Sequence, residues 1–219
     1  MSRETSTIAF IFVAKKMKQL HYISGITITL FILLHLSNHL FSLLGVEKHL
    51  EVMTILRVFY RNIIVEFVLV CAILLQIVSG ITLFFRKRKV ANSFLEKLQL
   101  WSGGYLAIFF VFHLTAVFVG RLVLNLDTNI YFGVAGLNTF PFLLFFIPYY
   151  VLAIISFFGH IAAIHSIKMK KKVLGVTPNK QAYFIVFIGI VVSIVVIYGL
   201  TNGFKGIEIP KDYHVMIGK

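Results

Sequence analysis

Residues 98–121 read LQLWSGGYLAIFFVFHLTAVFVGR, an apolar run that carries one histidine, His113, in its second half. About 20 apolar residues are enough to cross the hydrocarbon core of a bilayer as a helix. Histidine is costly in hydrocarbon, so His113 should have a partner or a function. The stretch therefore predicts a membrane helix with a functional side chain inside it.

The whole chain repeats this pattern. Hydrophobic residues make up 59% of the 219 residues and charged residues only 13%, whereas soluble domains are about 45–50% apolar. Helices are expected in the apolar stretches, because backbone exposed to lipid must satisfy its own hydrogen bonds. We predict an all-α integral membrane protein, a single membrane domain over residues 1–219, with transmembrane helices at about 20–44, 60–85, 98–121, 141–167 and 181–201.

The basic residues give the direction of these helices. With the N-terminus inside, 14 of the 21 Lys and Arg residues lie on the inner side, namely Arg3, Lys15, Lys16, Lys18, Arg86, Lys87, Arg88, Lys89, Lys97, Lys168, Lys170, Lys171, Lys172 and Lys180. The positive-inside rule then predicts the N-terminus inside, the C-terminus outside and a multi-pass location in the cell's inner (cytoplasmic) membrane. We assign the net charge of +13 to helix ends and anionic lipid, and not to nucleic acid.

Three histidines lie deep in the predicted helices. His35 and His113 each lie 15 residues beyond the start of a span, roughly 22 Å from the inner face. His160 and Gln76 lie at a shallower common level, roughly 10–13 Å deep. In an up-down bundle of the first four helices, the first and third are diagonal, as are the second and fourth. Two imidazoles facing each other across a bundle can hold a haem iron, so His35 and His113 are predicted axial ligands of an outer, low-spin haem b.

Simpler roles for these histidines stay open. A single histidine in a membrane helix can simply hydrogen-bond a neighbouring helix. Zinc is a weaker alternative, because His35 and His39 have i, i+4 spacing but no carboxylate or thiol joins them in that helix. A short motif is repeated, as SGIT at 24–27 and 79–82 and as SGG at 102–104. Its small residues indicate either close helix packing or room for a flat group.

At these residues the chain resembles the single-chain, five-helix cytochrome b subunit of succinate dehydrogenase and fumarate reductase. The resemblance covers about residues 18–200 and rests on short motifs. They are Leu20-His21-x-x-Ser24-Gly25 followed by His35 and Asn38-His39, Leu98-Gln99-x-x-Ser102-Gly103 followed by His113, and His160 followed by Thr177-Pro178. It implies a subunit that anchors a flavoprotein and an iron–sulfur protein on the inner face and passes electrons between them and quinone. Such a subunit transfers electrons within an oxidoreductase complex and is not a catalyst on its own.

The second helix departs from the family pattern. Gln76 stands where two-haem members have a histidine, and no histidine occurs in residues 60–85. An amide oxygen is a poor iron ligand, which leaves two alternatives for an inner haem. It is either absent or held by His160 alone, and a third hypothesis makes His160 a core histidine hydrogen-bonded to Gln76.

Further polar residues in the apolar layer are candidate site residues. A carboxylate inside a membrane helix is expensive and often functional, so Glu66 is a candidate proton relay for quinone chemistry, with an ion pair to Arg61 or Arg121 as the alternative. His39 and His21 are candidates for haem propionate contacts, with helix–helix hydrogen bonding and a solvated helix end as the respective alternatives. The loop 125–141 mixes turn and apolar residues and is expected to fold over the outer site as a lid.

Two other functions remain compatible with the sequence. One is a stand-alone membrane cytochrome b with a different electron donor. The other is a haem-free membrane transporter or assembly protein, for which Gly/Pro breaks in mid-membrane would be expected. Only Pro148 interrupts a predicted span, which argues mildly against transport.

Overall fold

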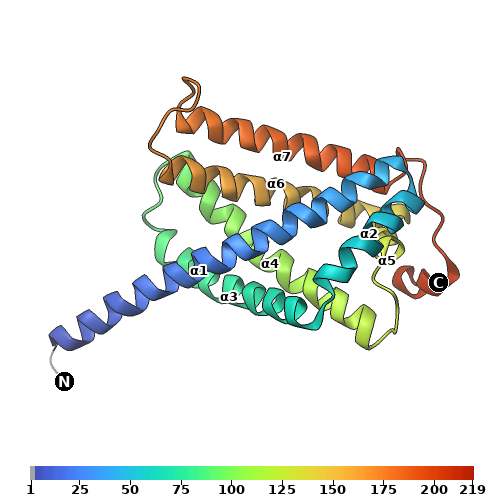
Figure 1. Cartoon of the computed structure of the whole chain (residues 1–219), viewed down its shortest axis with the longest axis horizontal. Helices are drawn as coiled ribbons and strands as arrows, with labels where there is room; N and C mark the ends of the chain where they lie inside the picture. The colour runs from blue at the N-terminus through green and yellow to red at the C-terminus, as the bar shows by residue number, and fades with distance from the viewer. Residues whose placement is uncertain (1–2) are drawn as a thin grey trace.

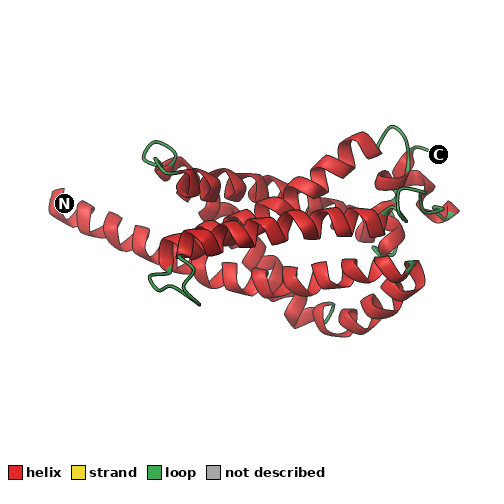
Figure 2. Cartoon of the chain, turned by 90° about the horizontal axis from the view of Figure 1, so that it is seen from above, coloured by secondary structure: helices red, strands yellow, loops and turns green. Residues whose placement is uncertain are grey.

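The computed structural model describes residues 3–219, with side chains described from Lys15 onward. The described part is helical and contains no strand, only one isolated bridge between Val173 and Val176 (Figure 2). Its elements are α1 (Arg3–Leu40), η1 (Phe41–Leu44), α2 (Val46–Tyr60), α3 (Ile63–Lys87), α4 (Phe94–Leu122), α5 (Ile130–Val134), η2 (Gly136–Asn138), α6 (Leu143–Lys168), α7 (Pro178–Leu200) and η3 (Lys211–Ile217).

Five described segments are long and apolar enough to span a membrane: Lys15–Leu44, Ile63–Lys87, Phe94–Leu122, Leu143–Lys168 and Pro178–Leu200. The five predicted spans are therefore confirmed as a multi-pass membrane architecture. The N-terminal helix is longer than predicted, because α1 begins at Arg3 and not near residue 20. The helix extends beyond the apolar span through the polar segment that contains Lys15, Lys16 and Lys18. This is possible because a helix satisfies its own backbone hydrogen bonds in water as well as in lipid.

The sequence determines where several helices begin. Ser93 and Glu96 form a reciprocal capping box at the start of α4, which satisfies amide groups that the first turn leaves unpaired. Asn62 caps α3 by accepting a hydrogen bond from the Ile64 amide. The chain turns from η1 into α2 at Gly45, whose φ of 102° favours glycine.

One helix was not predicted. The segment 46–60 was expected to be a polar connection, and it forms the 15-residue helix α2. With 15 residues it is too short for a membrane span. Apolar or buried residues recur in it at helical spacing: Val46, His49, Leu50, Met53 and Tyr60. This helix lies across the end of the bundle where α5 and the C-terminus also lie (Figure 1).

The long helices run side by side (Figures 1 and 2). α1 packs against α3, α3 against α4 and α4 against α6, while α7 packs along α6 and reaches α1 and η1. In this order α1 and α4 are diagonal, as are α3 and α6, which agrees with the up-down arrangement expected for the first four spans. The two chain ends lie at opposite ends of the bundle. We call the end that carries residues 15–18, 86–89 and 168–172 the basic end.

Candidate functional site

Two cavities in the described part of the bundle contain the predicted site histidines. The first, of about 310 Å³, is lined by His35, His39 and His113 among mostly apolar side chains, and we call it the histidine cavity. The second, of about 470 Å³, is lined by Gly25, Gly80, Gly103 and Gly104, and we call it the glycine-lined cavity. Both volumes lie in the range of about 300–1,000 Å³ that is usual for ligand sites.

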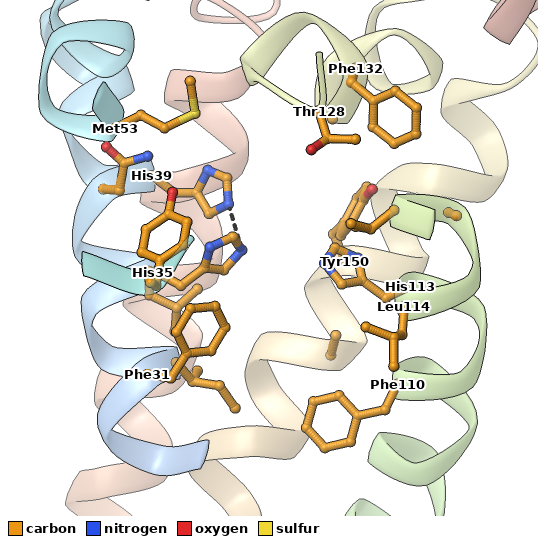
Figure 3. A pocket seen from close by; sticks show the side chains of 18 of the residues that line it. Phe31, His35, His39, Met53, Phe110, His113, Leu114, Thr128, Phe132 and Tyr150 are labelled. Carbon is orange, nitrogen blue, oxygen red and sulfur yellow. Dashed lines mark hydrogen bonds between the residues drawn. The ribbon is translucent and has the colours of Figure 1, made fainter. Parts of the chain in front are cut away.

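His35 and His113 lie on opposite walls of the histidine cavity, on the diagonal helices α1 and α4 (Figure 3). Their ring centroids are 6.3 Å apart and their planes are inclined by 70°. Each ring stacks on an aromatic neighbour of its own helix: His35 on Phe31, with centroids 5.7 Å apart, and His113 on Phe109, with centroids 5.1 Å apart. The stacking holds both imidazoles in place within an apolar wall.

The spacing of the two rings suits a metal between them. A metal lies about 2 Å from a ligating imidazole nitrogen, and each ring adds about 1 Å to its centroid, so two imidazoles on opposite sides of one metal have centroids roughly 6 Å apart. In the described residues, no three His, Cys, Asp or Glu side chains come together as an ion site. A metal held by His35 and His113 therefore has to bring further ligands of its own, as the iron of a porphyrin does.

His39 lies one turn from His35 and belongs to a chain of hydrogen bonds. Its Nε2 lies 3.1 Å from Nε2 of His35, and its Nδ1 lies 3.2 Å from Nε2 of His49 on α2. Metal ligation by His35 through Nε2 requires His39 to release the first contact, while the contact to His49 can remain. The alternative of helix–helix hydrogen bonding is confirmed for His39, and its contact with a propionate stays a prediction.

His49 is a buried site residue that the sequence interpretation missed. Asn38 Nδ2 also lies 3.3 Å from His49 Nε2. Two side chains of α1, Asn38 and His39, therefore bind His49 and hold α2 over one end of the cavity. Burial, and to a smaller extent the charge of Arg57, lower the pKa of His49 to about 4, so it is neutral near pH 7. The helical spacing of residues 46–60 could have placed it, because His49 lies on the same face as Val46 and Met53.

Glu66 lines the histidine cavity and is paired with Arg121 of α4. Arg121 Nη1 donates to one carboxylate oxygen, and Nη2 lies 3.2 Å from the other. Of the two partners considered for Glu66, the structure selects Arg121, because Arg61 instead lies 3.3 Å from Asp127 and 2.9 Å from Thr128. The proton relay role of Glu66 remains a prediction.

The segment 125–141 covers this end of the cavity, as predicted for a lid. Ile130, Val134 and Leu137 are buried in the largest apolar cluster, and Thr128 and Phe132 line the cavity (Figure 3). The lid is held at Asp127, which pairs with Arg57 of α2 and with Arg61, the residue that follows α2. The backbone carbonyl of Asp127 also accepts a hydrogen bond of 3.0 Å from the Tyr213 hydroxyl.

Replacing Asp127 with asparagine is expected to loosen the lid. Burial raises the pKa of Asp127, but the hydrogen bond and charge of Arg57 and the charge of Arg61 outweigh it and hold this pKa below its usual 3.8. The carboxylate therefore stabilises the closed lid above about pH 4, and this contribution is lost as the pH falls through its lowered pKa. Because the pair is partly exposed, we expect at most about 1 kcal/mol, or roughly fivefold faster amide exchange in Thr128–Val134 at pH 7.

The pH dependence supplies the check on this prediction. The exchange rates of wild type and Asp127→Asn should converge when the pH falls below the pKa of Asp127, because a protonated carboxyl resembles an amide. Glu51→Gln, which removes the exposed pair between Lys48 and Glu51, is the matched control and should leave the lid unchanged. A difference between wild type and Asp127→Asn that is the same at every pH would contradict the assignment.

The glycine-lined cavity brings together His160, Gln76 and His21. The shared level predicted for His160 and Gln76 agrees with their place in one cavity. They are not hydrogen-bonded to each other: His160 Nδ1 lies 2.9 Å from the Gln99 carbonyl oxygen, and Gln76 Nε2 donates to the His21 carbonyl and to Ser24 Oγ. The hypothesis that His160 is a hydrogen-bond partner of Gln76 is therefore wrong.

His21 is also tied to a helix, because its Nδ1 lies 2.8 Å from Ser79 Oγ of α3. Lys18, Lys87 and Lys168 line the same cavity from the basic end of the bundle. His165, farther along α6, is bonded to Gln181 of α7 at 2.7 Å and does not line either cavity. Comparison with protein-family models, with curated proteins and with solved structures finds no significant match to this chain.

Proposed function

We propose that this chain is a haem b-carrying membrane anchor subunit of a succinate dehydrogenase or fumarate reductase-type complex, which passes electrons between an iron–sulfur partner and the quinone pool. The observation that carries the proposal is the placement of His35 and His113 on diagonal helices, with ring centroids 6.3 Å apart across a cavity. That spacing suits two axial imidazoles, and the donor set suits low-spin haem.

The residues around the pair fit a flat, apolar group with charged edges. Ile32, Leu106 and Phe110 supply apolar walls, while Arg57, Arg61 and Arg121 lie at the lid end of the cavity. Haem, when bound, supplies one-electron redox chemistry. The protein holds the two imidazoles by stacking, keeps water out with the lid, and places His39 where it can contact His35 or a propionate.

The positive charge of the basic end supports the proposal that partner subunits dock on that side of the membrane. Residues 86–89 and 168–172 put eight Lys and Arg side chains on the two loops there, and such clusters attract anionic lipid headgroups by default. A flavoprotein and an iron–sulfur subunit with acidic docking faces would use the same charges. The proposal of these two partner subunits is based on the family resemblance and on this charge. For quinone, Glu66 is the candidate residue that would transfer the proton.

The test is an absorption spectrum of the full chain purified in detergent and reduced with dithionite. We expect a b-type α-band in the reduced sample and, in the same preparation before reduction, a low-spin ferric signal by electron paramagnetic resonance, from at least one haem per chain. Absence of any b-type band would exclude both a complex subunit and a stand-alone cytochrome, and would favour a haem-free membrane protein.

A second measurement separates the complex subunit from a stand-alone cytochrome. In native membranes, succinate should reduce the band, or fumarate should reoxidise it after reduction. If the band is present and neither compound changes it, the chain takes its electrons from another donor and the proposed partners are wrong.

A further inference from the structure

The loop between α6 and α7 contains a short hairpin with an apolar tip. Two backbone hydrogen bonds close it, from Val173 N to Val176 O at 3.2 Å and from Val176 N to Val173 O at 2.9 Å. The two residues between them, Leu174 and Gly175, both have positive φ, 49° and 77°, as in a type I′ turn. We call residues 173–176 the hairpin tip.

Leu174 is an unusual residue for this turn. The first central position of such a turn favours Asn, Asp or Gly, because a larger side chain at positive φ crowds the backbone. Leu174 occupies that position and is 98% exposed, next to Val173 and Val176, which are 47% and 40% exposed. Burial within the chain therefore does not offset the strain at Leu174. This combination indicates an apolar contact outside the chain.

The base of the hairpin is held by hydrogen bonds to both flanking helices. Gln181 of α7 donates from Nε2 to the Val176 carbonyl at 2.7 Å, and its Oε1 lies 2.7 Å from His165 Nε2 of α6. The Ser166 hydroxyl donates to Asn179 Oδ1. These bonds join the last turns of α6 to the first turn of α7, so the hairpin tip is presented in one position.

Exposed aromatic side chains mark the level at which the basic end meets the membrane surface. Tyr22 of α1, Trp101 of α4 and Tyr183 of α7 are 51%, 67% and 53% exposed, and such residues gather at the level of the lipid headgroups. Tyr183 lies five residues beyond Pro178, the first residue of α7, which is about 8 Å along the helix. The loop before α7 therefore lies among the headgroups. Figure 1 shows it above the start of α7, where it projects to the side of the bundle.

Lysines flank the hairpin tip and have no carboxylate partner in the described part of the chain. Lys170, Lys171 and Lys172 precede the tip directly and are exposed, and none of the ion pairs among the described residues involves them. No Asp or Glu occurs in residues 128–207, and Glu96 at the start of α4 already accepts hydrogen bonds from two backbone amides. The charge around the tip therefore suits an anionic surface.

We propose that the hairpin tip and the lysines at 170–172 form a binding site for anionic lipid, in which Leu174 inserts below the phosphates and the lysines bind them. Lysine clusters alone attract any anion, and the apolar tip selects a lipid surface. An acidic protein docked on the end face of the bundle would meet the lysines but would leave Leu174, at the side, uncovered. The site fixes the height of α6 and α7 in the membrane, and it depends on neither haem nor the proposed partner subunits.

The test places a nitroxide label at the tip, with the full chain in lipid nanodiscs. Leu174→Cys is made in a Cys71→Ser background, because Cys71 is the only cysteine. Asn92→Cys, at an exposed polar position of the other loop at the basic end, is the matched control. Power saturation compares the accessibility of the label to oxygen, which concentrates in lipid, and to a water-soluble nickel chelate. In discs that contain phosphatidylglycerol, we expect the oxygen-to-nickel ratio at position 174 to exceed that at position 92 roughly threefold or more.

The dependence on charge decides between lipid and other occupants. In phosphatidylcholine alone, or with Lys171→Gln and Lys172→Gln together, the ratio at position 174 should fall toward the control value. Lys205→Gln with Lys211→Gln, two exposed lysines at the other end of the bundle, should leave it unchanged. A ratio equal to the control in both lipids overturns the proposal, and so does insertion that ignores lipid charge and the two lysines. A label that is open to water in the discs and shielded from both reagents only in an assembled complex would make a partner protein the occupant, and would also overturn it.

A second variant separates insertion from the shape of the turn. With the label introduced by Val176→Cys, Leu174→Asn retains a residue that tolerates positive φ and removes only the apolar tip. We expect the oxygen-to-nickel ratio at position 176 to fall about twofold or more in Leu174→Asn and to persist in Leu174→Met, which keeps an apolar side chain. An unchanged ratio in Leu174→Asn overturns the proposal. Because no readout uses haem, a chain that binds no haem can pass this test while the proposed function fails.

Discussion

Replacing His113 or His35 with alanine is expected to abolish the low-spin b-type spectrum of the protein. The two rings face each other across the histidine cavity with their centroids 6.3 Å apart, and among the described residues no three His, Cys, Asp or Glu side chains come together there as an ion site. Loss of either imidazole leaves the metal with one protein ligand, which is incompatible with a low-spin, two-histidine site. We expect the low-spin ferric signal to fall at least tenfold in each variant.

His39→Ala is the matched control for this experiment. His39 lies on the same helix, one turn from His35, and lines the same cavity, but the ring that faces His113 is that of His35. The control should keep the low-spin signal, with at most a change in redox potential through the lost contact to His35. A protein that loses the signal with His39→Ala and keeps it with His35→Ala would make His39 the ligand instead.

The membrane spans could be predicted because length and composition alone determine them. The segments predicted at 60–85 and 181–201 appear as Ile63–Lys87 and Pro178–Leu200. The α2 helix was missed because it is amphipathic and lies outside the spans, where hydropathy alone carries no signal. The common depth of His35 and His113 along their helices could be calculated from a rise of 1.5 Å per residue. The diagonal placement of these two helices could be predicted because short connections join neighbouring helices in the bundle.

The contacts between helices could not be predicted from spacing. The choice of Arg121 as partner of Glu66, and not Arg61, depends on how α3 packs against α4. The repeated Ser-Gly motif was visible in the sequence, but the helix that each copy contacts was not. Ser24-Gly25 lies against α3, Ser79-Gly80 against α1 and Ser102-Gly103 against α6. Sequence spacing gives the position of a residue on its own helix and says nothing about the side chain opposite.

Glu66→Gln is expected to lower quinone turnover at least a hundredfold while leaving the haem spectrum unchanged. Glu66 lines the histidine cavity, and general acid–base catalysis by a positioned side chain contributes about 10²–10⁴-fold. Glutamine keeps the size of the side chain and removes the proton-carrying group. Turnover is measured with the full complex and a soluble quinone analogue, and the spectrum is measured on the same preparation.

A structural role for Glu66 has to be separated from a proton relay, because the carboxylate also pairs with Arg121. The two side chains are only 29% and 27% exposed, and loss of one partner of a buried ion pair destabilises a fold, so stability has to be controlled separately. Arg121→Gln removes the ion pair and keeps the carboxylate, and Glu66→Asp keeps a carboxylate on a shorter side chain.

The three variants together decide the role of Glu66. If the residue relays protons, Glu66→Gln loses turnover, Arg121→Gln retains most of it and Glu66→Asp recovers a measurable part. If the ion pair only holds α3 against α4, Glu66→Gln and Arg121→Gln lose turnover equally and both alter the haem spectrum, because α4 also carries His113. Unchanged turnover in Glu66→Gln would remove Glu66 from the quinone chemistry altogether and leave the ion pair as its whole function.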